Sequence, residues 1–305
     1  MLVPIQNVTR GLMLAASAYL IFTLQDVAVR WLVANAGFLV WQVLMVRSVT
    51  IVTICLAASG PKLIGQAIRS QQKRSLLLRG AFTLGAWLCY YNAAKHLLYG
   101  QLVTIYYAAP IIITLLSIPL LKERVGVARW MAVLLGFIGV VIACEPGDFK
   151  VELPVWMTLG AAFMWAMSTI LLRKTSSSES TLLQMFISNL IFAVGCVGPT
   201  VWYWQQPTGF EWLLLLSVGI LGGMAQHLLF DSFRHAPASA IAPMEYSALI
   251  WAFGAGYVVW HEIPGRGVFL GAALIAISGV GAFIAERRQQ KATTAQRLEA
   301  ERMAA

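Results

Sequence analysis

The sequence is dominated by long apolar segments, each of about the length that crosses a lipid bilayer. A helix rises about 1.5 Å per residue, so roughly 20 apolar residues span a hydrocarbon layer of about 30 Å. Such segments fall at about 10–33, 38–58, 76–98, 101–121, 126–144, 154–173, 181–203, 212–233, 239–260 and 265–285. These runs are continuous and about twice as long as a transmembrane strand, which argues against a β-barrel. We therefore predict an all-α integral membrane protein with ten transmembrane helices.

The composition excludes a soluble protein. Hydrophobic residues make up 59% of the 305 residues, charged residues make up 11%, and the mean hydropathy is +0.74. Ten spans would use about 200 residues, which leaves only short connections. We expect no enzyme activity, because no soluble catalytic domain fits and no catalytic or metal-binding constellation is visible in the spans. No GxxxxGK[ST] loop occurs, which disfavours an ATP-driven pump.

The placement of the basic residues predicts the orientation. A net charge of +9 would suggest nucleic acid in a soluble chain, but here most Lys and Arg fall in alternate connections and in the tail at 287–305. The connections on the opposite side hold only Lys150 and Arg266. The positive-inside rule therefore predicts a multi-pass protein of a bacterial inner membrane with both termini in the cytoplasm and no nucleic-acid partner.

An internal repeat divides the chain into two halves. Residues 95–126 resemble residues 234–265 at a constant offset of 139. The matching positions are Lys95-His96 with Arg234-His235, Tyr107 with Tyr246, Glu123 with Glu262, and Gly126 with Gly265. Because each half holds five spans, the second copy crosses the membrane in the opposite sense.

The predicted units are therefore a first repeat at 10–144, a second repeat at 154–286 and a cytoplasmic tail at 287–305. Two similar halves in opposite orientations can exchange conformations, so that a central site opens to one side and then to the other. This architecture predicts transport by alternating access.

Several motifs resemble one family. They are Ala108-Ala109-Pro110 leading to Leu121-Lys122-Glu123-Arg124, the Gly136-Phe-Ile-Gly139 helix, and APASAIAPMEYSALIWAFGAGYVVWHEIPG at 236–265. On these residues the chain resembles the EamA branch of the drug/metabolite transporter superfamily over about residues 10–286, and within it the exporters of amino acids, aromatic ones above all. The second half departs from the pattern by placing Leu249 where Pro110 stands in the first, with Pro243 as another source of a kink.

Two ionisable residues inside the spans are candidates for substrate binding, because charge at membrane depth is costly. Arg47 lies in the middle of the second span and is interpreted as a partner for a substrate carboxylate. A structural clamp, with Arg47 pairing backbone carbonyls, Asp26 or Glu245, is the alternative. Glu245 is interpreted as a proton carrier or an amine partner. Asp26 is expected to pair with Arg30, four residues along the same helix.

Aromatic and neutral polar residues supply further candidates, with helix packing as the alternative for each. Together with Arg47 and Glu245, the predicted substrate-binding residues are Tyr107, Trp165, Tyr246, Trp251, Asn92 and Gln184. The four cysteines stand alone in or at the ends of apolar runs, so no cofactor or metal is expected.

We predict a secondary transporter that exports amino acids and related small metabolites as a monomer in the lipid bilayer. The family resemblance also implies an alternative, which is an importer of S-adenosylmethionine or of a riboflavin-like metabolite. A channel or a membrane-embedded enzyme is the alternative from another class, and both lack the residue pattern that they need.

Overall fold

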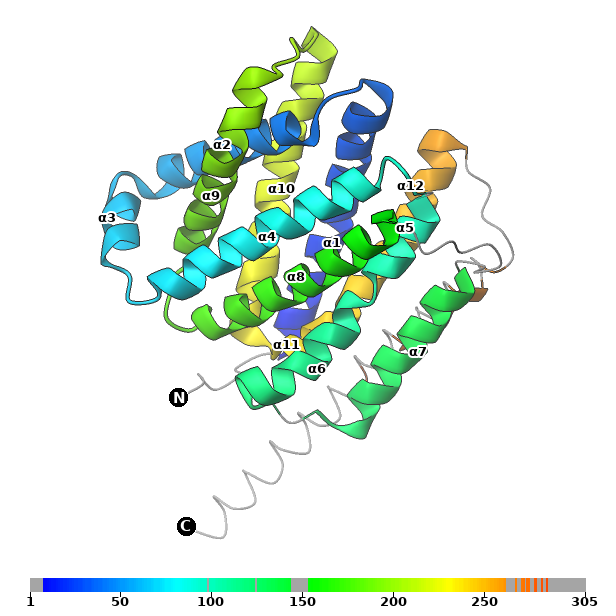
Figure 1. Ribbon diagram of the computed structural model, residues 1–305. Coiled ribbons are helices and arrows are strands. Elements are labelled where there is room, and N and C mark those ends of the chain that lie inside the picture. The colour runs from blue at the N-terminus through cyan, green and yellow to red at the C-terminus, as the bar shows by residue number, and fades with distance from the viewer. Residues whose placement is uncertain are drawn as a thin grey trace, which may run out of the picture.

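A computed structural model of the chain shows a bundle of helices (Figure 1). The structure describes residues 8–97, 99–123, 125–143 and 153–261, and single residues or pairs between 267 and 284. Most of the tenth apolar segment, the tail and the predicted repeat residues Glu262 and Gly265 lie outside the described residues. The described part consists of helices and their connections, as the long continuous apolar segments predict.

The helices follow one another with short connections in both halves. The first half contains α1 (Val8–Arg30), the π-helix η1 (Trp31–Asn35), α2 (Val40–Ser59), α3 (Lys62–Arg69), α4 (Lys73–Ala93), α5 (Tyr99–Tyr106), α6 (Ala109–Leu121) and α7 (Val127–Ala143). The second half contains α8 (Leu153–Thr175), α9 (Thr181–Trp202), α10 (Gly209–His235), α11 (Ala238–Ile241), the 3-10 helix η3 (Ala242–Tyr246) and α12 (Ser247–Trp260).

Five of the described helices are long and apolar enough to cross a membrane. They are Val8–Asn35, Val40–Ser59, Leu153–Thr175, Thr181–Trp202 and Gly209–His235. Large apolar side chains on them point outwards, as in Met13, Leu24 and Leu213, where lipid tails would cover them. The multi-pass membrane architecture is thereby supported, while the full count of ten spans stays a prediction.

Helices of the two halves alternate in the bundle. The most extensive contacts join α1 to α10, α4 to α8 and α2 to α9 (Figure 1). Close approach depends on small residues at the crossings. A Cβ added to Gly219 on α10 would lie only 2.5 Å from Cβ of Thr50 on α2, so a larger residue would force these helices apart. Each half therefore packs mainly on the other half around a common centre.

Both halves contain an interrupted helix at the same repeat position. In the first half, Tyr107 and Ala108 separate α5 from α6, and Pro110 lies in the first turn of α6. In the second half, a five-residue 3-10 turn ends at Tyr246, with Pro243 in its first turn. Proline lacks the N–H that continues a helical ladder, which explains an interruption at each place. The interruption in the second half thus falls at Pro243, although Leu249 replaces the proline of the first half.

Candidate functional site

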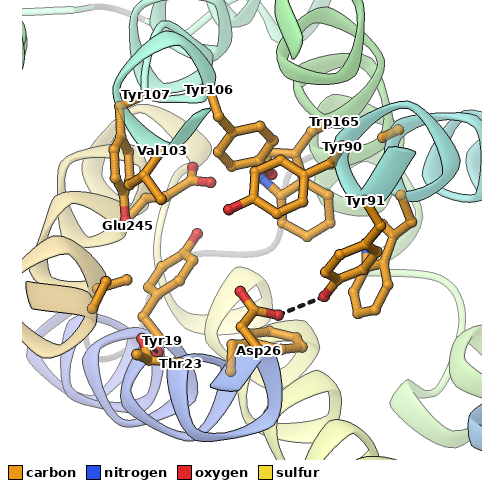
Figure 2. Close-up of a pocket in the computed structure, with 15 residues that line it drawn as sticks. Tyr19, Thr23, Asp26, Tyr90, Tyr91, Val103, Tyr106, Tyr107, Trp165 and Glu245 are labelled. Atoms are coloured by element: carbon orange, nitrogen blue, oxygen red, sulfur yellow. Dashed lines mark hydrogen bonds between the residues drawn. The ribbon is translucent and has the colours of Figure 1, made fainter. Parts of the chain in front are cut away.

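A cavity lies where the two interrupted helices meet α1, α4 and α8 (Figure 2). The empty space between its lining side chains, its mouth included, measures about 720 Å³. The lining residues are Tyr19, Phe22, Thr23, Asp26, Ala86, Trp87, Tyr90, Tyr91, Val103, Tyr106, Tyr107, Trp165, Glu245, Ala248 and Ala252. Both halves of the chain contribute lining residues, so we call this space the central cavity.

A ladder of aromatic rings forms one wall of the central cavity. Trp87, Tyr91, Tyr90, Tyr106 and Tyr107 follow one another edge to face, with ring centroids 5.0–6.2 Å apart. Such edge-to-face contacts fix the rings in place while leaving ring surface for a ligand. The wall can therefore hold a flat aromatic group or the face of a cation.

Glu245 places a carboxyl group in the central cavity. It lies in the 3-10 turn η3 and is 3% exposed. Its carboxyl group faces the ring of Tyr106 and the indole of Trp165 (Figure 2). Oε2 of Glu245 and Nε1 of Trp165 are both buried and make no hydrogen bond with the described residues. The indole of Trp165 still acts on the Glu245 carboxyl, and a polar ligand entering here would give both groups a better-aligned partner.

Asp26 places a second carboxyl group in the same space. The hydroxyl of Tyr91 donates a hydrogen bond of 2.6 Å to Oδ1 of Asp26, and Nε2 of Gln25 donates one of 3.4 Å. These hydrogen bonds run to Tyr91 on α4 and to Gln25, and the pair with Arg30 that the sequence suggested stays a prediction. Asp26 therefore faces the cavity and is a functional candidate beside Glu245 (Figure 2).

Arg47 lies on α2 behind the wall of the central cavity. It is 2% exposed, and its Nε and Nη1 donate to Oε1 of Gln25 at 3.1 Å and to Oδ1 of Asn189 at 3.2 Å. Its guanidinium carbon also lies 4.3 Å from the ring centroid of Trp87. The sequence offered a carboxylate or backbone carbonyls as structural partners, but these hydrogen bonds go to amide side chains.

The other predicted site residues divide into two groups. Tyr107 and Trp165 line the central cavity, whereas Asn92, Gln184 and Trp251 do not. Tyr246 belongs to η3, and its side chain lies outside the described residues.

The three residues away from the cavity have other surroundings. The amide of Asn92 donates to the carbonyl of Leu88 within its own helix. The side chain of Gln184 accepts a hydrogen bond of 2.7 Å from Thr175, at the far end of α8. Trp251 is 46% exposed. These contacts are those of packing and lipid-facing residues rather than of a shared site.

From the sequence, the face of α1 that lines the cavity was not assigned to the binding site. Tyr19, Thr23 and Asp26 lie on that face. Their spacing of four and three residues is the helical repeat that brings side chains to one side. This polar stripe in an apolar helix was the signal that could have found them.

At the end of the bundle that carries Arg173, which we call the Arg173 end, the two halves are joined by contacts that would separate the central cavity from that side. Nε of Arg173 lies 3.9 Å from Oε1 of Glu123, and the same oxygen accepts a hydrogen bond of 3.0 Å from the backbone N–H of Ala238. Arg173 also donates to the backbone carbonyl of Phe233. These contacts tie α6, α8, α10 and α11 together.

A second cavity adjoins the central one on the opposite side. It shares Asp26, Tyr90 and Tyr91 with the central cavity and extends to Arg30 and Lys95. The empty space of this second cavity also measures about 720 Å³. The central cavity therefore has a neighbouring space towards the Lys95 end and the contacts between the halves at the Arg173 end.

No three His, Cys, Asp or Glu residues of the described part are grouped as a metal site would need. The chemistry that the site offers is binding, by aromatic faces and two carboxyl groups. A helical membrane bundle with a cavity between two halves that are joined at one end defines a membrane transporter.

The chain belongs to the EamA-like transporter family, whose model matches residues 9–144 and 153–284. The resemblance noted in the sequence is thus confirmed at the level of the family. Placement in the amino-acid exporter branch stays a prediction.

Three curated relatives illustrate the range of the family. A riboflavin transporter of Vibrio cholerae is 33% identical over 224 residues, which are 70% of this chain and 73% of that protein. An S-adenosylmethionine uptake transporter of Rickettsia bellii is 31% identical over 171 residues, 55% of this chain and 58% of that protein. A pseudopaline exporter of Pseudomonas aeruginosa is 24% identical over 218 residues, 70% of this chain and 76% of that protein.

A solved crystal structure has the same fold. It matches with a TM-score of 0.75 at 19% sequence identity and covers 92% of this chain and 98% of that chain. At this identity the match supports the arrangement of helices alone.

Proposed function

We propose that this protein takes up a small aromatic metabolite that carries positive charge, by alternating access through the central cavity. The observation that carries the proposal is the meeting of an aromatic ladder with two carboxyl groups, Asp26 and Glu245, in one buried space. Aromatic faces and carboxylates both attract cations, and the attraction strengthens where water is excluded. A solute that combines a flat ring with a cationic group therefore suits this wall.

The relatives support a metabolite of this size and kind. S-adenosylmethionine combines an adenine ring with cationic sulfonium and ammonium groups, and the Rickettsia bellii relative is an S-adenosylmethionine uptake transporter. It is our first candidate substrate.

Riboflavin is the second candidate substrate. The aromatic ladder from Trp87 to Tyr107 favours it, because that wall can stack on a flat tricyclic ring without any charge. The Vibrio cholerae relative is a riboflavin transporter. Riboflavin leaves the two carboxyl groups of the cavity without a cationic partner, so we rank it second.

Export of amino acids, which the sequence suggested, stays a prediction. An aromatic amino acid could occupy the ladder through its ring and offer its ammonium group to Glu245. Sidedness of flux separates this hypothesis from uptake.

Alternating access follows from the two halves and the closure between them. The two interrupted helices lie 139 residues apart and both border the central cavity, which suits a pair of inverted repeats around one site. Opening the contacts of Glu123 with Arg173 and Ala238 while closing the Lys95 end would expose the same cavity to the opposite side. By the positive-inside prediction, the Arg173 end faces the cytoplasm.

Transport into proteoliposomes of defined orientation tests the proposal. Purified protein is offered labelled S-adenosylmethionine, riboflavin, phenylalanine and tryptophan from either side. We expect saturable movement of S-adenosylmethionine towards the Arg173 side. Saturable movement of riboflavin alone overturns the positive charge of the solute and leaves the second candidate. Saturable movement of the amino acids alone, or of none of the four solutes, contradicts the proposal as a whole.

A further inference from the structure

We propose that Arg47 and the side chains around it form an anion subsite next to the central cavity, so that the transported solute is a zwitterion whose carboxylate binds there. This inference rests on the proposed function, because it names the part of the substrate that the central cavity leaves unbound. It assigns Arg47 a part in specificity as well as in structure.

The first observation is the incomplete neutralisation of Arg47. The hydrogen bonds of its guanidinium with the described residues go from Nε and Nη1 to the neutral amides of Gln25 and Asn189. Asp26 acts on Arg47 at a distance, with Gln25 bonded between them. A guanidinium carries five N–H donors in a planar fork, so Nη2 keeps donors that these two bonds do not use. A buried guanidinium that meets amides attracts an anion more strongly than a guanidinium already paired with a carboxylate.

The second observation is a separate compartment in front of this cation. It is lined by Arg47, Thr83, Ser168, Thr169 and Gln226 together with apolar side chains. The compartment is narrow: a water-sized sphere can occupy only about 20 Å³ of it, so its side chains must move apart to admit a carboxylate. The hydroxyls of Thr83 and Ser168 lie 2.6 Å apart and form one hydrogen bond. Thr83 also donates to the backbone carbonyl of Arg79. The remaining donors beside the guanidinium are therefore the hydroxyl of Thr169 and the amide N–H groups of Gln226, which are groups that bind a carboxylate.

The third observation is the wall between the two spaces. Phe22, Trp87 and Trp165 line both the central cavity and this compartment. A solute seated between these rings can therefore reach the carboxyl groups of Asp26 and Glu245 on one side and Arg47 on the other. The charges are complementary to those of an amino-acid group. The two carboxyl groups would meet its ammonium, and the guanidinium of Arg47 would meet its carboxylate.

A hydrogen-bonded network holds the two subsites together. Arg47 links Gln25 of α1 to Asn189 of α9, and Nδ2 of Asn189 donates to Oε1 of Gln226 on α10 at 2.9 Å. Gln25 continues the network to Asp26. The cation of the protein is thereby fixed relative to its carboxylates, which sets the spacing that a zwitterion must match.

The inference distinguishes between the candidate substrates. S-adenosylmethionine carries a carboxylate beside its ammonium and sulfonium groups, whereas riboflavin carries no carboxylate. Removing the carboxylate alone gives decarboxylated S-adenosylmethionine, which keeps the adenine ring and both cationic groups. The pair differs only in the group that Arg47 would bind.

The experiment compares uptake of these solutes in proteoliposomes. The wild type, Arg47→Gln, Thr169→Val and the control Glu211→Gln are each given S-adenosylmethionine, its decarboxylated analogue and riboflavin. Glu211 serves as the matched control because it lies in an exposed capping box at the start of α10, away from the cavity.

We expect the wild type to prefer S-adenosylmethionine over its decarboxylated analogue by roughly 10- to 100-fold, the range of a charge-assisted hydrogen bond. Arg47→Gln should bring this ratio close to one, Thr169→Val should lower it less, and Glu211→Gln should keep it. If Arg47→Gln does not insert into the membrane, the ratio for Thr169→Val decides.

Three results overturn the inference alone, and a fourth overturns the proposed function with it. Equal uptake of the two analogues by the wild type, or an unchanged ratio in both Arg47→Gln and Thr169→Val, removes the anion subsite but leaves the proposed function. Uptake of riboflavin without S-adenosylmethionine also removes it and leaves the second candidate substrate. Uptake of none of the three solutes overturns the proposed function itself.

Discussion

The contact between Glu123 and Arg173 predicts how readily the Arg173 end opens. Both side chains are largely buried, with 7% and 6% of their surface exposed, and Nε of Arg173 lies 3.9 Å from Oε1 of Glu123. Glu123→Gln removes the negative charge, and the amide oxygen can still accept the hydrogen bond from the backbone of Ala238. The substitution therefore isolates the electrostatic part of the closure.

The size of the effect follows from Coulomb's law. Two unit charges about 4 Å apart attract each other by about 4 kcal/mol at an effective dielectric constant of ~20. The desolvation that the pair undergoes on closing offsets part of this gain, so we expect a net loss of about 2 kcal/mol. At 1.36 kcal/mol for each factor of ten, the open population at the Arg173 end should rise roughly 30-fold.

Thiol labelling measures this population. Cys55, Cys89, Cys144 and Cys196 are replaced by alanine, and Ala248→Cys places a single thiol in the wall of the central cavity. A membrane-impermeant maleimide is then added from the side that the Arg173 end faces. We expect Glu123→Gln in this background to be labelled roughly 30 times faster than the same single-cysteine protein with Glu123 intact. An unchanged rate, with Glu211→Gln as control, refutes the argument that this ion pair holds the end closed.

The remaining predictions concern the binding wall and the helix crossing behind it. Glu245→Gln and Asp26→Asn should each lower the apparent affinity for S-adenosylmethionine by 10-fold or more, because each removes a buried charge that faces the cation, and riboflavin uptake should change less. A direct binding assay with both solutes checks this, and equal losses for the two solutes contradict it. Gly222→Ala should lower the melting temperature in detergent, because the added Cβ would lie 2.7 Å from Nε of Arg47 and overpacking costs roughly 1–3 kcal/mol. Gly223→Ala is the matched control, since its Cβ would meet Ile51 at an ordinary 3.4 Å, and equal melting temperatures for the two variants would count against the packing argument.

The sequence predicts the long helices well, because apolar length is a property of the chain itself. The segments expected at 10–33, 38–58, 154–173, 181–203 and 212–233 correspond to five helices that are long enough to span. The segment expected at 101–121 is instead divided into α5 and α6. Hydropathy sums over a window and does not register the break at Tyr107 and Ala108. Pro110, three residues after Tyr107, lacks the N–H that would continue the hydrogen bonding of the preceding helix.

The candidate site was less predictable, because depth in a span says nothing about which way a side chain faces. Glu245, Tyr107 and Trp165 meet in the central cavity, yet Gln184, near the start of α9, is bonded to Thr175 at the end of α8. The facing of a residue depends on the rotation of its helix and on its neighbours, which one sequence leaves open.

Arg79 illustrates the same limit from the other direction. The positive-inside rule places Arg79 with the basic residues of the cytoplasmic connection before the third span. In the structure it is buried in α4, where Nη2 donates to the carbonyl of Gln184 and to the hydroxyl of Ser188. Its guanidinium also lies over the ring of Phe230, at 4.4 Å from the centroid. The connection before α4 contains a short helix, α3. The helix α4 begins at Lys73, three residues before the apolar segment that the sequence predicts from residue 76.

Counterflow in proteoliposomes tests the central claim most directly, since only a carrier whose one site faces each side in turn exchanges solute across the membrane. Vesicles loaded with unlabelled S-adenosylmethionine are placed in a trace of the labelled solute. We predict that the label accumulates above its external concentration, reaches a maximum and then declines, and that Glu245→Gln abolishes this overshoot. If labelled S-adenosylmethionine inside the vesicles never exceeds its external concentration, and its entry does not depend on the unlabelled solute inside, the account is contradicted.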